Sequence, residues 1–213
     1  MILPALALLE FDSVAAGIYA ADVMVKRAPI ALLKAGTVHP GHYLVLVGGT
    51  VASVEEAWRA GRGDGQGQGN GQRFLLDEVF LPDVHEEVFR GAMGERREIQ
   101  EEALGIIETR GVASLLRAAD ASVKGADVRI AELRLADDLG GRAFVLFDGR
   151  LNAVQAALEI AGSRIAEGQI LHQSLLSRLD GNLRRLLDTT TRFAACVGFE
   201  PEGAERPQQG AAW

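Results

Sequence analysis

The sequence has 213 residues, of which 48% are hydrophobic and 24% charged, with a net charge of −7 and one cysteine. This composition excludes a wholly disordered chain, and no apolar run reaches the roughly 18 residues that a membrane-spanning helix needs. A lone cysteine excludes an internal disulfide, which suits a reducing compartment, and the acidic balance argues against a nucleic-acid partner. Residues 1–10 lack a basic stretch ahead of their apolar one, so we expect no signal peptide and a cytoplasmic location.

Hydrophobic periodicity predicts the elements of the first half in chain order. A short buried strand at 5–10 precedes a helix with Val14, Ile18, Ala21 and Val25 on one face. Two strands, a helix, a strand and a final helix follow, at 30–38, 43–48, 51–60, 74–81 and 84–92. We interpret the glycine-rich stretch 61–71 as a flexible surface loop. A phosphate-binding loop is the alternative, but the lysine and hydroxyl residue of that motif do not follow the glycines.

The second half repeats the first. Ala5, Leu6, Glu10, Asp22 and Lys26 recur at constant spacing as Ala103, Leu104, Glu108, Asp120 and Lys124. The same elements recur in the same order: a strand at 103–108, a helix after it, and further elements at 128–135, 143–148, 150–166, 169–176 and 180–195. In the repeated first helix, the apolar face consists of Val112, Leu115, Ala119 and Val123.

Each copy has the order strand–helix–strand–strand–helix–strand, which is the ferredoxin-like order. The predicted fold class is therefore α+β, with two tandem domains that each contain an antiparallel four-stranded sheet with helices on one face. We expect the first domain at 1–92, a charged linker at 93–101, the second domain at 102–196 and a flexible tail at 197–213.

The residues Ala103-Leu-Gly-Ile-Ile-Glu and Ala118-Ala-Asp-Ala-Ser-Val-Lys, with their first-copy counterparts at 5–10 and 20–26, resemble the bacterial microcompartment shell domain. Two such domains in one chain resemble the tandem-domain, trimer-forming shell proteins. The segment Val79–His85 is most similar to the propanediol-utilisation type. The resemblance implies a homotrimeric pseudohexamer that tiles with other shell proteins around encapsulated enzymes. It also implies a central pore for small polar metabolites.

In the resembled family, the loop between the second and third strands lines this pore. The resemblance therefore implies pore-lining roles for His39, Pro40, Gly41, Asp137, Asp138, Gly140 and Gly141. A redox branch of the family has a cysteine where this chain has His39, and Cys196 lies far away, so no iron–sulfur cluster is expected. Three converging His39 imidazoles are an alternative site for zinc or another borderline metal. Asp137 and Asp138 form either an electrostatic filter or a polar turn.

The resemblance also implies residues at the outer edge of the assembly. Lys26 and Lys124 lie at matching helix ends, where this family packs one assembly against the next. Arg178 and His85 each keep one member of the family's Arg-Pro-His edge motif. The two edges are therefore expected to differ.

We find no nucleophile–base–orienter pattern, so we do not expect an enzyme. Glu10 and Glu108 end matching strands and suit structural hydrogen bonding better than a paired-carboxylate site. The predicted function is a passive shell protein. Its rivals are a trimer that binds a metal or redox cofactor through His39, and a ferredoxin-like regulator that binds a metabolite.

Overall fold

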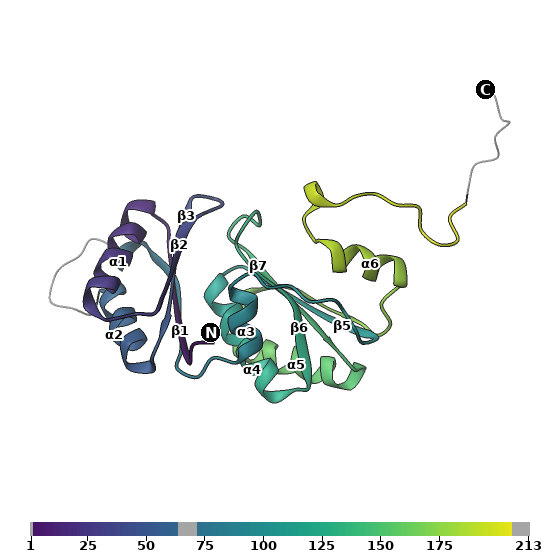
Figure 1. The fold of residues 1–213 in the computed structure, drawn as a ribbon, viewed down its shortest axis with the longest axis horizontal. Helices are drawn as coiled ribbons and strands as arrows, with labels where there is room; N and C mark the ends of the chain where they lie inside the picture. The colour runs from purple at the N-terminus through teal and green to yellow at the C-terminus, as the bar shows by residue number, and fades with distance from the viewer. Residues whose placement is uncertain (1, 64–71, 206–213) are drawn as a thin grey trace, which may run out of the picture.

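A computed structural model describes residues 2–63 and 72–205, and it shows the predicted duplication directly (Figure 1). Most of the predicted glycine-rich loop, from residue 64 to 71, and the end of the predicted tail, from residue 206, lie outside the described residues.

The first copy has seven main elements. They are β1 (Ala5–Phe11), α1 (Val14–Arg27), β2 (Leu32–Val38), β3 (His42–Gly49), α2 (Val51–Gly61), β4 (Leu75–Leu81) and α3 (Glu86–Ala92). A 3₁₀ turn at Gln72–Phe74 leads into β4. The strands form an antiparallel sheet in the order β2-β3-β1-β4.

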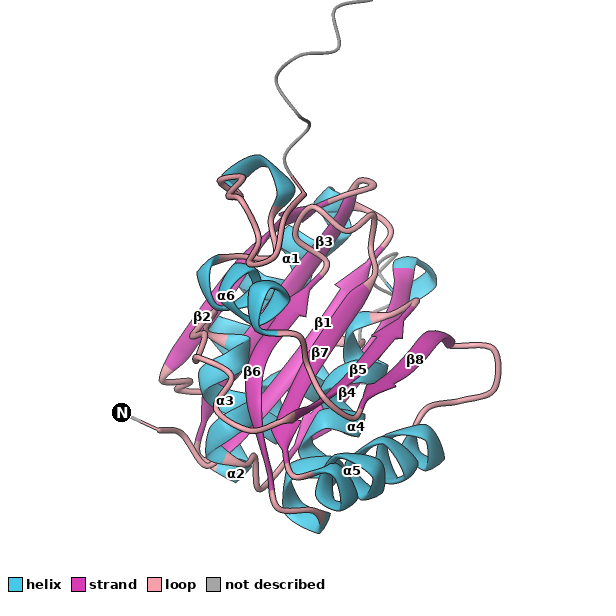
Figure 2. Ribbon diagram, turned by 90° about the vertical axis from the view of Figure 1, so that its right-hand side faces the viewer, coloured by secondary structure: helices cyan, strands magenta, loops and turns pink. Residues whose placement is uncertain are grey.

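The second copy repeats this arrangement. Its elements are β5 (Ala103–Thr109), α4 (Val112–Gly125), β6 (Val128–Leu135), β7 (Ala143–Gly149), α5 (Leu151–Arg164), β8 (Ile170–Leu176) and α6 (Gly181–Thr189). Its sheet has the equivalent order β6-β7-β5-β8, which can be followed in Figure 2. The predicted α+β class, the order of elements along the chain and the antiparallel four-stranded sheet are confirmed in both copies.

The central strand β1 is apolar except for Glu10, because both of its faces are covered. Along β1, Ala5, Ala7, Leu9 and Phe11 pack with α1 and α2 in one cluster. Leu6 and Leu8 point to the opposite face and join a second cluster, which includes residues of α3 and α4. The two copies therefore share a core within the chain.

The last predicted helix is shorter than expected. The periodicity predicts a helix over 180–195, whereas α6 ends at Thr189 and Thr190 is already extended, with φ −170°. Three consecutive threonines occupy 189–191, and β-branched residues lose side-chain freedom in a helix. Phe193, which the helical spacing places on an apolar stripe, is 95% exposed.

Candidate functional site

The first candidate loop joins β2 to β3 and carries His39, Pro40 and Gly41. All three residues are exposed. The Gly41 amide donates to the Val38 carbonyl at 2.9 Å and closes the turn. Gly41 has φ 113°, a conformation that residues with a side chain rarely adopt, so a glycine is needed there.

The second candidate loop joins β6 to β7 and approaches the first. A Cβ atom placed on Gly141 would lie 3.3 Å from Cδ of Pro40 and 3.5 Å from the His42 ring. In Figure 1 the two loops rise side by side above their sheets. The structure thus brings together the two loops that the sequence singled out, one from each copy.

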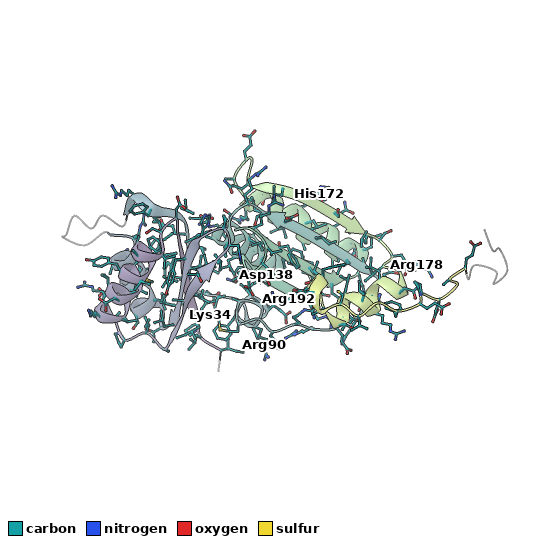
Figure 3. The ribbon with its side chains drawn as sticks, turned by 90° about the horizontal axis from the view of Figure 1, so that it is seen from above. Lys34, Arg90, Asp138, His172, Arg178 and Arg192 are labelled. Atoms are coloured by element: carbon teal, nitrogen blue, oxygen red, sulfur yellow. The ribbon has the colours of Figure 1, made fainter. Side chains whose placement is uncertain are left out.

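Asp137 and Asp138 lie exposed in this second loop, and both pair with Arg192 from the segment that follows α6 (Figure 3). The hydrogen bond to Asp137 raises the pKa of Arg192 above its ordinary value. Arg192 was absent from the sequence-based candidates. No local pattern marks it, because its partners lie more than fifty positions earlier in the chain.

A buried carboxylate anchors the segment that carries Arg192. Glu132 on β6 is 5% exposed and accepts a hydrogen bond from the Thr191 hydroxyl at 2.8 Å. Arg96 forms an ion pair with the same carboxylate at 3.1 Å, and Arg134 donates to the Thr191 hydroxyl at 3.2 Å. The residue directly before Arg192 is therefore held on β6 by its hydroxyl group.

Glu10 and His42 form a second polar group below the two loops. One Glu10 oxygen lies 2.8 Å from Nδ1 of His42, and the other accepts from the Val112 amide at 3.5 Å. Burial raises the pKa of Glu10, while the hydrogen bond to His42 acts in the opposite direction. At the matching place in the second copy, Glu108 lies 3.6 Å from Arg142. These contacts favour the structural role expected for both glutamates.

The contact between the copies is formed by α4 on the β1–β4 side of the first sheet. The cap position of α4 is Gly111, which has no side chain to cap the helix. Asp77 on β4 does so instead, accepting from the amide and the hydroxyl of Ser114, both at 3.2 Å. A carboxylate is favourable at a helix N-terminus, where free amides and the helix dipole meet.

Two of the predicted edge residues lie at the same contact. The His85 amide donates to Asp120 at 2.8 Å, and the His85 side chain caps α3. Lys124 pairs with Asp120 at 2.7 Å and also donates to the Asp83 carbonyl. The structure therefore joins His85 and Lys124 through one carboxylate.

The other two predicted edge residues lie on open surface. Lys26 pairs with Asp22 at 2.6 Å, which repeats the pair of Asp120 and Lys124. Arg178 lies exposed just after β8 (Figure 3). Lys26 on the first copy thus matches Lys124 on the second, and Arg178 on the second copy matches Asp83 on the first.

The matching first helices differ sharply in burial. Leu116 on α4 is 1% exposed, whereas Ile18 at the matching position of α1 is 53% exposed. Val14 and Val25 are exposed as well, so of the four residues on the apolar face predicted for this helix only Ala21 is buried in the single chain. The buried side of α1 consists of Ala16, Gly17, Ala20, Ala21 and Met24. The predicted face is the one that α4 buries against the first copy.

The last helix of each copy shows the converse difference. The helix α3 buries Val88, Phe89, Gly91 and Ala92, and it packs against β6 and α4. Its counterpart α6 buries none of its residues, although Leu183, Leu186 and Leu187 recur on one side. Within the described residues, α1 and α6 are therefore two helices on which apolar side chains stay exposed or only partly buried.

No helix among the described residues is long and apolar enough to cross a membrane. A model of the BMC domain matches this chain twice, at residues 5–84 and 103–179. The chain is 32% identical over 178 residues to the bacterial microcompartment shell protein PduT of Citrobacter freundii, covering 82% of this chain and 92% of that one.

Solved structures agree with these matches. A microcompartment protein from Desulfitobacterium hafniense superposes with a TM-score of 0.72 and 34% identity, covering 86% of this chain and 99% of that one. A fused permuted hexameric shell protein from the RMM microcompartment shares the fold, with a TM-score of 0.52 and 19% identity over 75% of this chain and 80% of that one.

Proposed function

Because the chain belongs to the bacterial microcompartment (BMC) domain family, we propose that three copies of it close into a ring of six BMC domains that tiles a shell facet. Members of this family are structural shell proteins rather than enzymes, and this chain is one of them. The trimer, the residues around its pore and its partners are the parts that we propose.

One observation supports the trimer. The contact between the copies joins the first helix of one copy to the fourth strand of the other, and each chain has a second such helix and a second such strand that stay uncovered. The second copy docks its α4 onto the β4 side of the first copy. The first copy's matching helix α1 exposes Ile18, and the second copy's matching strand β8 exposes His172 and Leu175. Docking α1 of one chain onto β8 of another repeats the contact that already exists within the chain.

The positions of these surfaces suit ring closure. Figure 1 shows α1 at one end of the long axis and α6 at the other. Contacts between unlike surfaces build either a closed ring or an open filament, depending on the rotation between units. Since each copy stands for one sixth of a ring, three chains complete it.

The proposed ring places the two candidate loops of each chain around its axis. The lining then alternates between the loop of His39, Pro40 and Gly41 and the loop of Asp137, Asp138, Gly140 and Gly141. Arg192 offsets part of the carboxylate charge of the second loop. We propose a mixed polar lining that passes small polar metabolites by diffusion.

We propose this pore without an iron–sulfur cluster, because its loops carry no thiol. Cys196 instead donates to the Thr190 carbonyl at 3.7 Å, in the C-terminal segment. Within the described part of one chain, no group of three or more His, Cys, Asp or Glu side chains is arranged to hold a metal. A shared metal at His39 would need three chains, and metal analysis of the purified protein beside a His39→Ala variant tests for it.

Sedimentation velocity and native mass spectrometry of the full chain test the proposed function. We expect a trimer, and electron microscopy of overexpressed protein is expected to show flat sheets or tubes. A chain that stays monomeric or dimeric at every concentration would refute the ring. Discrete soluble trimers with saturable metabolite binding and no sheets would instead support a regulator.

A further inference from the structure

We propose that the contact between chains is specified by a size swap, in which Leu186 of one copy packs onto Ala35 of the next. In the matching contact within each chain, Gly91 on α3 packs onto Leu133 on β6. The inference rests on the proposed ring and names the surface that recognises a second copy of this chain.

The equivalence of these positions follows from backbone contacts. The Val84 amide donates to the Pro4 carbonyl at 3.0 Å ahead of α3, and the Leu179 amide donates to the Glu102 carbonyl at 2.9 Å ahead of α6. The two helices therefore leave their sheets in the same way. His85 caps α3 and Asp180 caps α6, and the same step along each helix leads to Gly91 and to Leu186.

The strand positions are equivalent as well. Ala35 on β2 pairs with Val45, and Leu133 on β6 pairs with Val145, at matching points of the two sheets. Ala35 is exposed, whereas Leu133 is buried beneath α3.

Size complementarity is visible at the contact within the chain. A Cβ atom on Gly91 would lie 2.7 Å from Cβ of Leu133, so a side chain larger than hydrogen does not fit there. In the proposed contact between chains the large residue lies on the helix, as Leu186, and the small one on the strand, as Ala35. Dense packing requires the sum of the two volumes to be nearly kept, and the swap keeps it to within one methyl group.

A separate pair of differences points to the same partner. A Cβ atom on Gly111 would lie 2.8 Å from Oδ2 of Asp77, so the carboxylate that caps α4 needs a glycine opposite it. At the matching place α1 begins with Ser13, whose hydroxyl accepts from the Ala16 amide at 3.3 Å. The second copy presents His172 where the first presents Asp77. In the proposed contact between chains, α1 is capped by its own Ser13, so its partner strand does not need an acidic residue and has His172 instead.

These differences make the two contacts non-interchangeable. Leu186 on α6 would collide with Leu133, and Ser13 would crowd Asp77. The edge formed by β8 and α6 is thus complementary to the surface formed by α1 and β2 of another chain. It does not fit the surface formed by α4 and β6.

Compensating substitutions in the full chain test the swap. Ala35→Leu opposes Leu186 with a second large residue, and Leu186→Gly leaves Ala35 without a partner. We expect each single variant to need at least about tenfold more protein to form trimers in sedimentation velocity. The double variant Ala35→Leu/Leu186→Gly recreates the pair of Gly91 and Leu133, and we expect it to assemble within about threefold of the unaltered chain.

Arg185→Gly is the matched control for adding a glycine to α6, because it lowers helix propensity equally without removing Leu186. Circular dichroism and thermal melting of each variant show that the chains are folded. Single variants that assemble normally, or a double variant that is no better than the singles, would overturn the size swap while leaving the ring intact. An unaltered chain that forms no trimer would instead refute the proposed function.

Discussion

Glu10 places a carboxyl group at the contact between the two copies, with 2% of its surface exposed. Its hydrogen-bonding partners are His42 on β3 and the amide of Val112 at the start of α4. Asp77, which caps the same helix, adds a negative charge that also raises the pKa of Glu10. A single titratable group is thus tied to both copies of the fold.

We predict that Glu10→Gln makes folding stability less dependent on pH. The pKa of Glu10 is raised in the folded state, so the neutral acid favours folding. That contribution is fully present below the unfolded pKa of about 4.5 and is lost as pH rises through the higher folded value. Urea unfolding at several pH values should show the unaltered chain losing stability relative to Glu10→Gln between about pH 4.5 and neutrality.

Glu108→Gln is the matched control for this prediction, because Glu108 occupies the same place in the second copy and lies beside Arg142. A stability difference between Glu10→Gln and the unaltered chain that stays constant with pH would contradict the assigned role of burial.

Arg192 makes a second prediction at the scale of residues. Removing its guanidinium leaves the carboxylates of Asp137 and Asp138 without their ion pair, and hard cations prefer such oxygen ligands. We expect Arg192→Gln to bind Tb³⁺ at least about tenfold more tightly, as measured by lanthanide luminescence.

The control for this second prediction is Arg185→Gln, because Arg185 lies over the Phe199 ring in the same C-terminal part of the chain. Adding Asp137→Asn and Asp138→Asn to the Arg192→Gln variant should abolish the gain in binding. An unchanged Tb³⁺ affinity would show that Arg192 does not govern the charge of this loop.

At the scale of elements, the helices α1 and α4 show what one sequence pattern becomes in two environments. Both are 14 residues long and both carry an apolar stripe. Only the stripe of α4 meets a covering surface within the chain. The stripe of α1, with Ile18 at its centre, is expected to be covered by another chain.

We predict that Ile18→Ser weakens trimer formation at least tenfold in sedimentation velocity and leaves the melting temperature of the dissociated chain unchanged. The reason is that Ile18 loses contacts only between chains. Leu116→Ala at the matching position should instead lower the free energy of unfolding by about 2–5 kcal/mol, because it empties a site in the core. A large loss of monomer stability from Ile18→Ser would contradict this division of roles.

The sequence predicts the elements well because each depends on local periodicity. The duplication locates both sheets, and the Pro/Gly loops between their second and third strands are where the structure has them. The side of α1 that is buried is not predictable in this way, because periodicity records every surface that a helix covers, including surfaces between chains. The pairing of Arg192 with Asp137 and Asp138 is equally hidden, since it depends on how the segment after α6 returns to the sheet.

At the scale of the whole molecule, the two copies hold matching lysines in different surroundings. Lys124 is held by Asp120 and by the Asp83 carbonyl, whereas Lys26 pairs with Asp22 on its own helix. The exposed fractions of the two lysine side chains are 37% and 72%. In the proposed ring these positions alternate around the rim, so neighbouring rings meet at edges of two kinds.

We predict that Lys26→Ala and Lys124→Ala both reduce the flat sheets seen by electron microscopy while the trimer persists in sedimentation velocity. A rim lysine acts between rings rather than within one, so ring closure does not depend on it. Lys124→Ala should also lower the melting temperature slightly, because it removes a partly buried ion pair with Asp120 and the hydrogen bond to the Asp83 carbonyl of the first copy. Lys26→Ala should leave it unchanged, since exposed ion pairs contribute about 0–1 kcal/mol.

Lys34→Ala, on β2, is the control, because the Lys34 amine donates to the Ala92 carbonyl inside the chain at 3.1 Å. If flat sheets form equally well without either lysine, the contacts between rings use other surfaces of the two copies.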